Sequence, residues 1–415
     1  MKHSVKLTCM ILAVSAALHL SACDDSGGQG DSTPWDSISV TGITARNDSI
    51  DIFWKNSSDH VEITWSLDGE TVDSGNGITQ YGITGLSPGT EYDITLAAVD
   101  SSGNRSANQI MLDVYTTGGA EKNYSLIYTL SQLDAVRENP GGDYLLMADI
   151  DLNVRPHNSG DGWSPIGNGS DPFTGSFNGN NHVVKNMYIN TPGVSHRGFF
   201  GYTAGAFICN LGLETVNVTG GDDTGSLAGW SDSSSIIDCF AAGSVSGDYS
   251  TGGLVGFSID SDVRRCYASA VVAGGANCTG GLIGGNYSSD LTDCYAIGPV
   301  GGRAYTGGLV GWNGYASVFT SCYAAGTVTA SIATAYKGGL VGYDYDGSTT
   351  YGSCFYDTMA TGMNSANQDY GAPRTTSEMK SPATFTGIEP AWDFDSVWGM
   401  DGSINAGYPY LRDNH

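Results

Sequence analysis

A block of glycines and aliphatic residues recurs through the second half of the chain and constrains its fold more than any other feature. Six copies of the block follow one another at nearly constant spacing. A period of about 28 residues indicates a solenoid, in which each repeat buries its apolar face against its neighbours. The copies are Gly198-Phe-Phe-Gly201, Gly225-Ser-Leu-Ala-Gly229, Gly252-Gly-Leu-Val-Gly256, Gly280-Gly-Leu-Ile-Gly284, Gly307-Gly-Leu-Val-Gly311 and Gly338-Gly-Leu-Val-Gly342.

A parallel β-helix meets the physical demands of this repeat. Each rung needs tight corners, and glycine provides both positive φ angles and close backbone approach. We therefore expect a right-handed parallel β-helix with rungs of about 28 residues, each made of three short strands.

Six cysteines follow the blocks at nearly the same period: Cys209, Cys239, Cys266, Cys294, Cys322 and Cys354. Disulfides between rungs are one reading, since stacked Cα atoms would lie about 4.8 Å apart. Equivalent positions in a stack favour free buried thiols, because cysteine packs as a small apolar residue. Each inward cysteine would face away from the apolar residue three positions earlier on a straight strand, so we expect a bend between them. Cys278 is out of register with the six.

The first 22 residues have the features of an export signal. A basic start precedes Thr8–Leu20, an apolar stretch shorter than the about 20 residues of a spanning helix. Leu20-Ser-Ala-Cys23 resembles the lipobox of bacterial lipoproteins, which implies cleavage before Cys23 and acylation of its thiol. The acyl chains would then anchor the protein to a membrane. The alternative is an ordinary secretory signal that happens to contain a cysteine.

Residues 23–35 combine the lipidated cysteine with a polar, glycine- and serine-rich tether. Asp24 resembles an inner-membrane retention signal in some lipoproteins, whereas the acidic pair Asp24-Asp25 resembles a surface-export signal in others. The outer membrane or cell surface is favoured, and the periplasmic face of the inner membrane stays open. The formal net charge of −26 argues against nucleic acid as a partner, because two negatively charged molecules repel each other.

Residues 36–118 show short strands with alternating apolar residues, which predict a β-sandwich. Trp54 and the run Leu86-Ser-Pro-Gly-Thr-Glu-Tyr92 resemble the core tryptophan and tyrosine corner of fibronectin type III domains. That resemblance implies a tyrosine hydroxyl bonded back to the upstream backbone. A spacer between the membrane and the solenoid is favoured over a ligand-binding module.

The remainder of the chain resembles the GLUG-repeat proteins, which are bacterial surface or adhesin-like proteins or noncatalytic parts of secreted enzymes. The resemblance implies first rungs or a cap over residues 119–192, repeats over 193–360 and a C-terminal cap over 361–415. Besides the repeated block, it rests on Asp149-Ile-Asp-Leu152, Trp163-Ser-Pro-Ile-Gly167, Phe173-Thr-Gly-Ser-Phe-Asn-Gly-Asn-Asn-His182, Trp392-Asp-Phe394, Trp398 and Gly407-Tyr-Pro-Tyr-Leu411.

An aromatic residue accompanies four of the cysteines and forms a candidate ligand-facing ladder. Stacked on an outer face, these rings could bind sugars, and packing against neighbouring structure is the favoured alternative. The ladder consists of Phe240, Tyr267, Tyr295 and Tyr323.

Four carboxylate pairs can be compared with the needs of a glycosidase, which places two carboxyl groups about 5 to 9 Å apart. The pairs occupy different kinds of position in the repeat, so we assign no catalytic residue. Asp344-Tyr-Asp-Gly347 is a weak calcium candidate that lacks the later acidic ligands, and the scattered histidines support no zinc site. No cofactor is expected. The pairs are Asp149 with Asp151, Asp222 with Asp223, Asp260 with Asp262, and Asp344 with Asp346.

These observations favour a lipid-anchored cell-envelope protein that binds or adheres through a rigid β-helix surface. Its expected partners are the membrane, reached through Cys23, and glycans or surface proteins. The chain is more consistent with a binding protein than with an enzyme. A polysaccharide lyase or glycosidase and a noncatalytic scaffold remain as alternatives.

Overall fold

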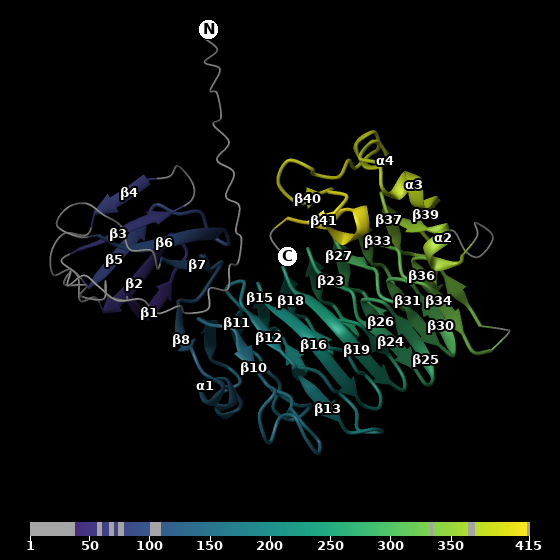
Figure 1. The fold of residues 1–415 in the computed structure, drawn as a ribbon, viewed down its shortest axis with the longest axis horizontal. Helices are drawn as coiled ribbons and strands as arrows, with labels where there is room; N and C mark the ends of the chain where they lie inside the picture. Colours follow the sequence, from purple (N-terminus) through teal and green to yellow (C-terminus); the bar gives the residue numbers. More distant parts are fainter. Residues whose placement is uncertain are drawn as a thin grey trace, which may run out of the picture.

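The computed structural model describes residues 38–55, 60–65, 70–73, 79–99, 109–332, 335–363 and 370–412. These residues form a β-sandwich and a long parallel β-helix (Figure 1). The predicted fold class is confirmed: an all-β chain in which a fibronectin type III-like sandwich precedes a β-solenoid with rungs of about 28 residues. The signal, the tether and Cys23 lie outside the described residues.

Two sheets make up the sandwich. Trp54 and Tyr92 are both buried in it. The Tyr92 hydroxyl accepts a hydrogen bond from the backbone N–H of Ser87 at 2.8 Å, which confirms the predicted tyrosine corner. One sheet contains β4 (Glu70–Asp73), β3 (His60–Trp65), β6 (Glu91–Val99) and β7 (Ile110–Tyr115), and the other contains β1 (Ser39–Ala45), β2 (Ser49–Lys55) and β5 (Gln80–Thr84).

The sandwich and the β-helix share a 12-stranded sheet, here called sheet 1. Strand β1 pairs antiparallel with β8 (Lys122–Ile127), and β8 pairs in parallel with β9 (Asp143–Leu146). The sandwich therefore covers the backbone edge at which the β-helix begins. The other β-helix strands of sheet 1 are β11 (Ser176–Asn178), β15 (Phe207–Cys209), β18 (Ser235–Ile237), β22 (Asp262–Arg264), β27 (Asp290–Thr292), β32 (Val318–Thr320) and β37 (Thr350–Gly352).

Polar side chains reinforce this junction. Glu91 accepts hydrogen bonds from the Asn210 amide at 2.6 Å and from the Tyr115 hydroxyl at 2.9 Å. The same hydroxyl lies 3.3 Å from a carboxylate oxygen of Asp238, whose carboxylate also accepts two hydrogen bonds from Arg265. These contacts join β6 and β7 of the sandwich to the turns of three successive rungs.

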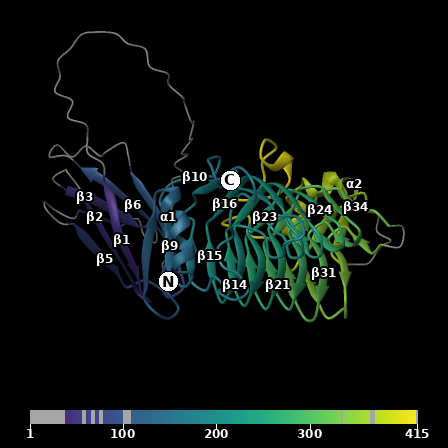
Figure 2. The same cartoon turned by 90° about the horizontal axis from the view of Figure 1, so that it is seen from below.

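Each regular rung passes through four sheets. In one rung, β21 (Val255–Ile259) lies in the six-stranded sheet 3 and β22 in sheet 1. The chain then enters the 13-stranded sheet 2 through β23 (Tyr267–Ala268) and β24 (Val271–Gly274) and sheet 4 through β25 (Asn277–Gly280). Sheet 4 is an addition to the three strands expected per rung. Figure 2 shows β14, β21 and β31 of sheet 3 following one another along the β-helix.

The remaining β-helix strands occupy the same sheets. Sheet 3 also holds β14 (Phe200–Ala204), β17 (Ala228–Asp232), β26 (Ile283–Tyr287), β31 (Val310–Gly314) and β36 (Val341–Asp344). Sheet 4 also holds β20 (Thr251–Gly252), β30 (Ala304–Gly307) and β35 (Lys337–Gly338). Sheet 2 also holds β10 (Ile150–Asp151), β12 (Val183–Lys185), β13 (Tyr188–Asn190), β16 (Gly212–Thr219), β19 (Phe240–Gly247), β28 (Tyr295–Ala296), β29 (Val300–Gly302), β33 (Tyr323–Ala324), β34 (Val328–Ala330), β38 (Phe355–Asp357) and β39 (Ala372–Arg374).

The repeated glycines let neighbouring rungs approach closely. A Cβ atom on Gly253, Gly281 or Gly308 would lie 2.1 Å from a carbonyl oxygen of the next rung. The expected close approach of the backbones is confirmed. The expectation that glycine supplies the positive φ angles is wrong at the corners where the chain passes from sheet 1 to sheet 2. Short polar side chains tolerate this left-handed conformation, and arginine adopts it at one corner. The residues are Asn210, Asp238, Arg265, Asp293, Ser321 and Ser353.

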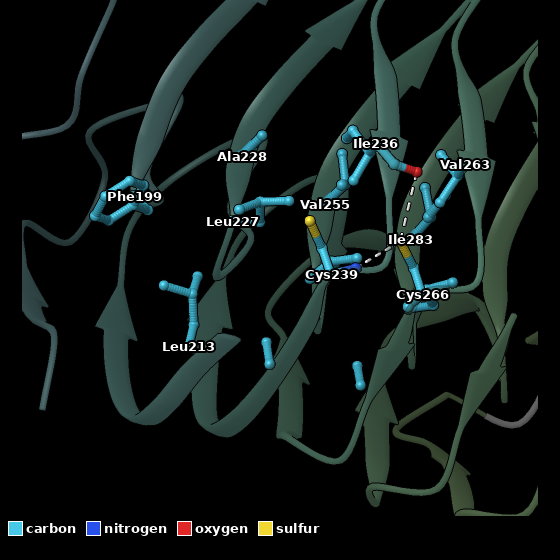
Figure 3. Packing of buried hydrophobic residues seen from close by; sticks show 14 of the residues in the cluster. Phe199, Leu213, Leu227, Ala228, Ile236, Cys239, Val255, Val263, Cys266 and Ile283 are labelled. Atoms are coloured by element: carbon cyan, nitrogen blue, oxygen red, sulfur yellow. Dashed lines mark hydrogen bonds between the residues drawn. The ribbon is translucent and has the colours of Figure 1, made fainter. Parts of the chain in front are cut away.

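The predicted bend before each cysteine lies at these corners. Between Ile236 and Cys239 the chain turns at Asp238, whose φ is 52°. Both Ile236 and Cys239 are therefore buried among other core residues, as are Val263 and Cys266 in the next rung (Figure 3). The Cys266 thiol donates to the Ile236 carbonyl at 3.5 Å, so the cysteines also connect rungs by weak hydrogen bonds.

The cysteine ladder has five members rather than six, because Cys209 is out of register. Cys209 pairs with Ile237, and Gly212 pairs with Phe240, so Leu211 takes the position equivalent to the later cysteines. Cys209 is still buried, and Cys278 lies in β25 with a positive φ of 62°. All are free thiols in the structure; the ladder consists of Cys239, Cys266, Cys294, Cys322 and Cys354.

The C-terminal segment folds along the outer side of sheet 2, where Figure 1 shows it in yellow near β33. Its aromatic residues form a separate cluster with the rings of β28, β33 and β38. The helices within the described ranges are short: α1 (Leu130–Asp134), η1 (Ala135–Glu138), α2 (Thr358–Thr361), α3 (Thr376–Met379), α4 (Ala383–Thr386) and η2 (Asn405–Gly407). A two-stranded sheet pairs β40 (Trp398–Gly399) with β41 (Tyr410–Leu411).

Candidate functional site: an aromatic face of the β-helix

Sheet 3 carries an aromatic column on its outer side. The residue after the final glycine of each repeated block belongs to this column, and the parallel register aligns its members across the sheet. Five of the six are aromatic, and one is glycine. Sequence reasoning missed this column although its signal is periodic. The members are Tyr202, Trp230, Phe257, Gly285, Trp312 and Tyr343.

The first three rings of the column stack on one another. The Tyr202 and Trp230 rings lie 5.7 Å apart with an interplanar angle of 12°, and the Trp230 and Phe257 rings lie 4.6 Å apart at 25°. Because Trp230 stacks between Tyr202 and Phe257, both of its faces are covered, and each of the other two half-buried rings has one covered face.

Glycines change the geometry beyond Phe257. Gly285 leaves an empty side-chain position, and the Phe257 ring leans over it: a Cβ there would lie 2.6 Å from Phe257. Trp312 leans along its own strand instead. Its six-membered ring covers Gly314, where a Cβ would lie 2.3 Å from the Cη2 atom. Trp312 therefore lies low against the sheet rather than stacking on the ring of the previous rung.

One tyrosine ring lies beside that of Trp312, and two more tyrosines extend the group from it. The ring of Tyr345 lies 6.3 Å from that of Trp312 at 48°. Tyr315 contacts both Tyr345, at 6.1 Å and 38°, and Tyr287, at 4.6 Å and 43°. Two of them are strongly exposed, Tyr315 at 45% and Tyr345 at 57%.

A second tyrosine group adjoins on the side of sheet 4. Tyr343, the register partner of Trp312, lies 5.0 Å from Tyr305 and 4.8 Å from Tyr336, which is 46% exposed. We call the whole surface the aromatic platform; it comprises Tyr287, Tyr305, Trp312, Tyr315, Tyr336, Tyr343 and Tyr345. Exposed aromatic surface of this kind marks binding sites more often than plain solvent-facing structure.

The hydroxyls of Tyr287 and Tyr305 are neutral hydrogen-bonding groups at physiological pH. Desolvation and the neighbouring Tyr315 raise the pKa of Tyr287. Desolvation and the neighbouring Tyr343 raise the pKa of Tyr305. Each hydroxyl can both donate and accept, so the platform combines flat apolar faces with a polar rim.

The ladder proposed from the sequence divides into two halves. Its rings stack at 4.7 to 5.0 Å with interplanar angles of 2 to 7°. Tyr295 and Tyr323 are buried beneath the C-terminal segment, and the Tyr323 hydroxyl donates to the Pro409 carbonyl at 2.6 Å. These two residues pack against the chain itself and offer no ligand surface. Phe240 and Tyr267 are half-buried.

The carboxylate pairs do not converge on a reaction centre. Asp149 accepts from His182 at 3.1 Å and lies 3.2 Å from the Lys185 amine, while Asp151 accepts from Asn186 at 2.8 Å. Burial raises the pKa of Asp149, but its hydrogen bonds outweigh this and lower the pKa overall.

The other pairs are likewise engaged in separate local contacts. Asp222 accepts from the Tyr249 N–H, Asp223 lies 3.4 Å from His196, and Asp262 pairs with Arg264. Asp260 has a left-handed backbone, Asp344 accepts from Tyr351, and Asp346 accepts from Ser348. Across the part of the chain that the structure describes, no three His, Cys, Asp or Glu side chains gather closely enough to hold a metal ion.

Within the same described ranges, no helix combines the length and apolarity needed to cross a bilayer. The proposed lipid attachment point, Cys23, lies before these ranges. The membrane anchor therefore stays a prediction from the sequence.

Comparison with protein families identifies both modules. Residues 32–111 match the fibronectin type III domain, and residues 275–300 and 302–329 match the GLUG motif. The resemblances inferred from Trp54, the tyrosine corner and the repeated block are thereby confirmed for these segments. The remaining rungs share the fold of the matched ones.

Two relatives are similar over part of the chain. Halomucin of Haloquadratum walsbyi is 29% identical over 223 residues, which cover 47% of this chain and 2% of halomucin. A putative Gly-rich membrane protein of Evansella cellulosilytica is 34% identical over 118 residues, which cover 28% of this chain and 14% of that protein. The chain thus spans a small fraction of either relative's length.

Among solved structures, a family 28 exopolygalacturonase of Yersinia enterocolitica aligns over 69% of this chain and 85% of its own. The sequence identity is 12% and the TM-score is 0.16. A TM-score this low supports no argument about fold or activity.

Proposed function

We propose that the protein is a lipid-anchored binding or adhesion protein of the cell envelope, which presents its β-helix to glycans or other surface ligands. The aromatic platform carries the proposal. It places exposed rings on one rigid face, whereas most members of the four carboxylate pairs are engaged in separate local contacts. Binding by an extended surface needs no reactive centre, and the β-helix supplies that surface.

The names of the two relatives support an envelope location. One is named halomucin and the other a putative Gly-rich membrane protein, and each is similar to part of this chain. Acylation of Cys23 would hold the chain at a membrane, and the acidic, polar residues after it would serve as a tether.

The anchor is tested by expressing the full chain and its Cys23→Ser variant in a bacterial host. Wild type is expected in the membrane fraction, with an N-terminal acyl group detectable by mass spectrometry. The variant is expected to be soluble. Equal membrane association of the two chains would refute the anchor.

The binding function is tested with the chain that begins at residue 23 and carries Cys23→Ser, applied to a broad glycan array and to whole cells. Retention on at least one neutral glycan or cell type is expected. An absence of retention on all of them would refute the binding function. Release of new reducing ends or unsaturated sugars from polysaccharides would favour the enzymatic alternative.

A further inference from the structure

The position of Trp312 is set by two glycines. Gly314 lacks the Cβ that would otherwise meet the indole at 2.3 Å, so the ring can lie along its strand. Gly285, one rung earlier in the same column, leaves no side chain on which Trp312 could stack. One face of the Trp312 indole is thus directed toward the sheet. The aromatic column of sheet 3 provides no ring that could stack on the other face.

A group of three tyrosines extends from one side of this ring. Tyr345 meets it at an interplanar angle of 48°, and Tyr315 links Tyr345 to Tyr287. Inclined rings beside a flat ring present edges and hydroxyls around an apolar floor. This arrangement differs from the parallel stack of Tyr202, Trp230 and Phe257, in which ring faces contact each other.

We infer that Trp312 and its bordering tyrosines form a binding site for a neutral pyranose residue of a polysaccharide. A pyranose with mainly equatorial hydroxyls has a flat C–H face that matches the indole face, and its outward hydroxyls match the tyrosine hydroxyls. Acidic sugars fit less well, because the chain carries a formal net charge of −26 and would repel them. This inference rests on the proposed binding function. It specifies which part of the β-helix binds and which class of sugar it binds.

The site is tested by affinity electrophoresis of the chain from residue 23 with Cys23→Ser, in gels containing hydroxyethylcellulose, glucomannan, xylan or polygalacturonate. Retardation by at least one of the three neutral polymers is expected, with less or none by polygalacturonate. Trp312→Ala is expected to weaken that binding about tenfold or more, since a lost stacking contact is worth about 1.4 kcal/mol.

Two further variants separate the site from general effects. Trp230→Ala removes an aromatic residue of the same column whose faces are already occupied, and it should leave the affinity within about twofold. Gly314→Val keeps every ring but fills the space beneath the indole, so it should weaken binding as Trp312→Ala does. Circular dichroism and thermal melting verify that each variant is folded.

The outcomes distinguish this site from the broader function. If wild type binds a neutral polymer and folded Trp312→Ala binds equally well, the site is wrong and the binding function stands. If Trp230→Ala weakens binding as much as Trp312→Ala, the stacked part of the column takes part and the assignment to Trp312 is wrong. Stronger retardation by polygalacturonate than by all neutral polymers would overturn the neutral-sugar specificity. If the gels, the glycan array and whole cells all fail to retain wild type, the binding function itself fails.

Discussion

The junction between the sandwich and the β-helix should lose stability as pH rises, because burial there favours the protonated form of Asp113. Asp113 lies on β7 and is 9% exposed. One of its carboxylate oxygens accepts from the Asn181 amide at 2.8 Å, and its backbone N–H donates to the Asn180 side chain at 2.8 Å. Burial, the hydrogen-bonded Asp93 and the nearby Glu91 raise the pKa of Asp113 to about 7.

The sign and size of the effect follow from linkage. An ordinary aspartate titrates near 3.8, so between about pH 4 and pH 7 the folded state keeps a proton that the unfolded chain has lost. Stability contributed by the protonated group is complete below pH 4 and falls as pH rises through 7. Each pKa unit corresponds to about 1.4 kcal/mol, so the loss between pH 5 and pH 7 is on the order of 3 kcal/mol.

The assay is amide hydrogen exchange of β6 and β7, combined with urea unfolding, at pH 5, 7 and 8. In wild type, both the exchange protection, after correction for intrinsic rates, and the urea midpoint should fall across this range. Asp113→Asn keeps an acceptor for Asn181 but cannot ionise, so it should remove most of the dependence and be more stable than wild type at pH 8. Asp171→Asn, which changes an exposed loop carboxylate, serves as the matched control.

Two results would refute this reasoning. One is a wild-type junction whose stability is constant or rises from pH 5 to pH 8. The other is an Asp113→Asn variant with the same pH profile as wild type, which would place the titrating group elsewhere.

Three other substitutions test the packing of the two modules. Gly308→Ala should destabilise the β-helix by about 3 kcal/mol or more in thermal melts, because its Cβ would lie 2.1 Å from a backbone oxygen. Gly118→Ala is the control: its Cβ would have no atom within 4 Å, so its stability should stay within about 0.5 kcal/mol of wild type. Arg265→Ala should lower the free energy of unfolding in urea by about 3 to 5 kcal/mol, because it leaves the nearly buried Asp238 carboxylate without its cationic partner. Adding Asp238→Asn should recover part of that free energy. An Arg265→Ala variant as stable as wild type would contradict this. Tyr92→Phe should destabilise the sandwich by about 1 kcal/mol through loss of the Ser87 hydrogen bond, and an unchanged midpoint would show that the tyrosine corner contributes nothing measurable.

The period of the repeat predicted the rungs, but it could not align every residue within them. The spacing from Cys209 to Cys239 is close to that between the later cysteines, which suggests equivalence. In the structure the backbone register decides otherwise, because β15 pairs Cys209 with Ile237. Leucine and cysteine are both small enough for the same interior position, so residue identity alone does not distinguish Leu211 from a ladder cysteine.

The outward faces were harder to predict for a related reason. A strand of two residues, such as β23, β28 or β33, has too little alternation to show which side faces solvent. The aromatic residue after each repeated block, such as Trp230 or Trp312, is a periodic signal, but its period alone does not say which way the ring points. Burial of Tyr295 and Tyr323 depends on Trp392 and Trp398, which come from the far end of the chain.

Continuity of sheet 1 changes how the sandwich should be understood. A solenoid leaves unpaired N–H and C=O groups at its first strand, and such an edge invites pairing with other chains. Here β8 pairs with β1 of the sandwich, and Glu91 and Tyr115 bind side chains from later rungs. A module joined to the solenoid by both backbone and side chains contributes to the start of the β-helix itself. Because the described contacts of the sandwich are with sheet 1 and the corners beside it, the sandwich would influence the proposed binding at sheet 3 through the stability of the first rungs.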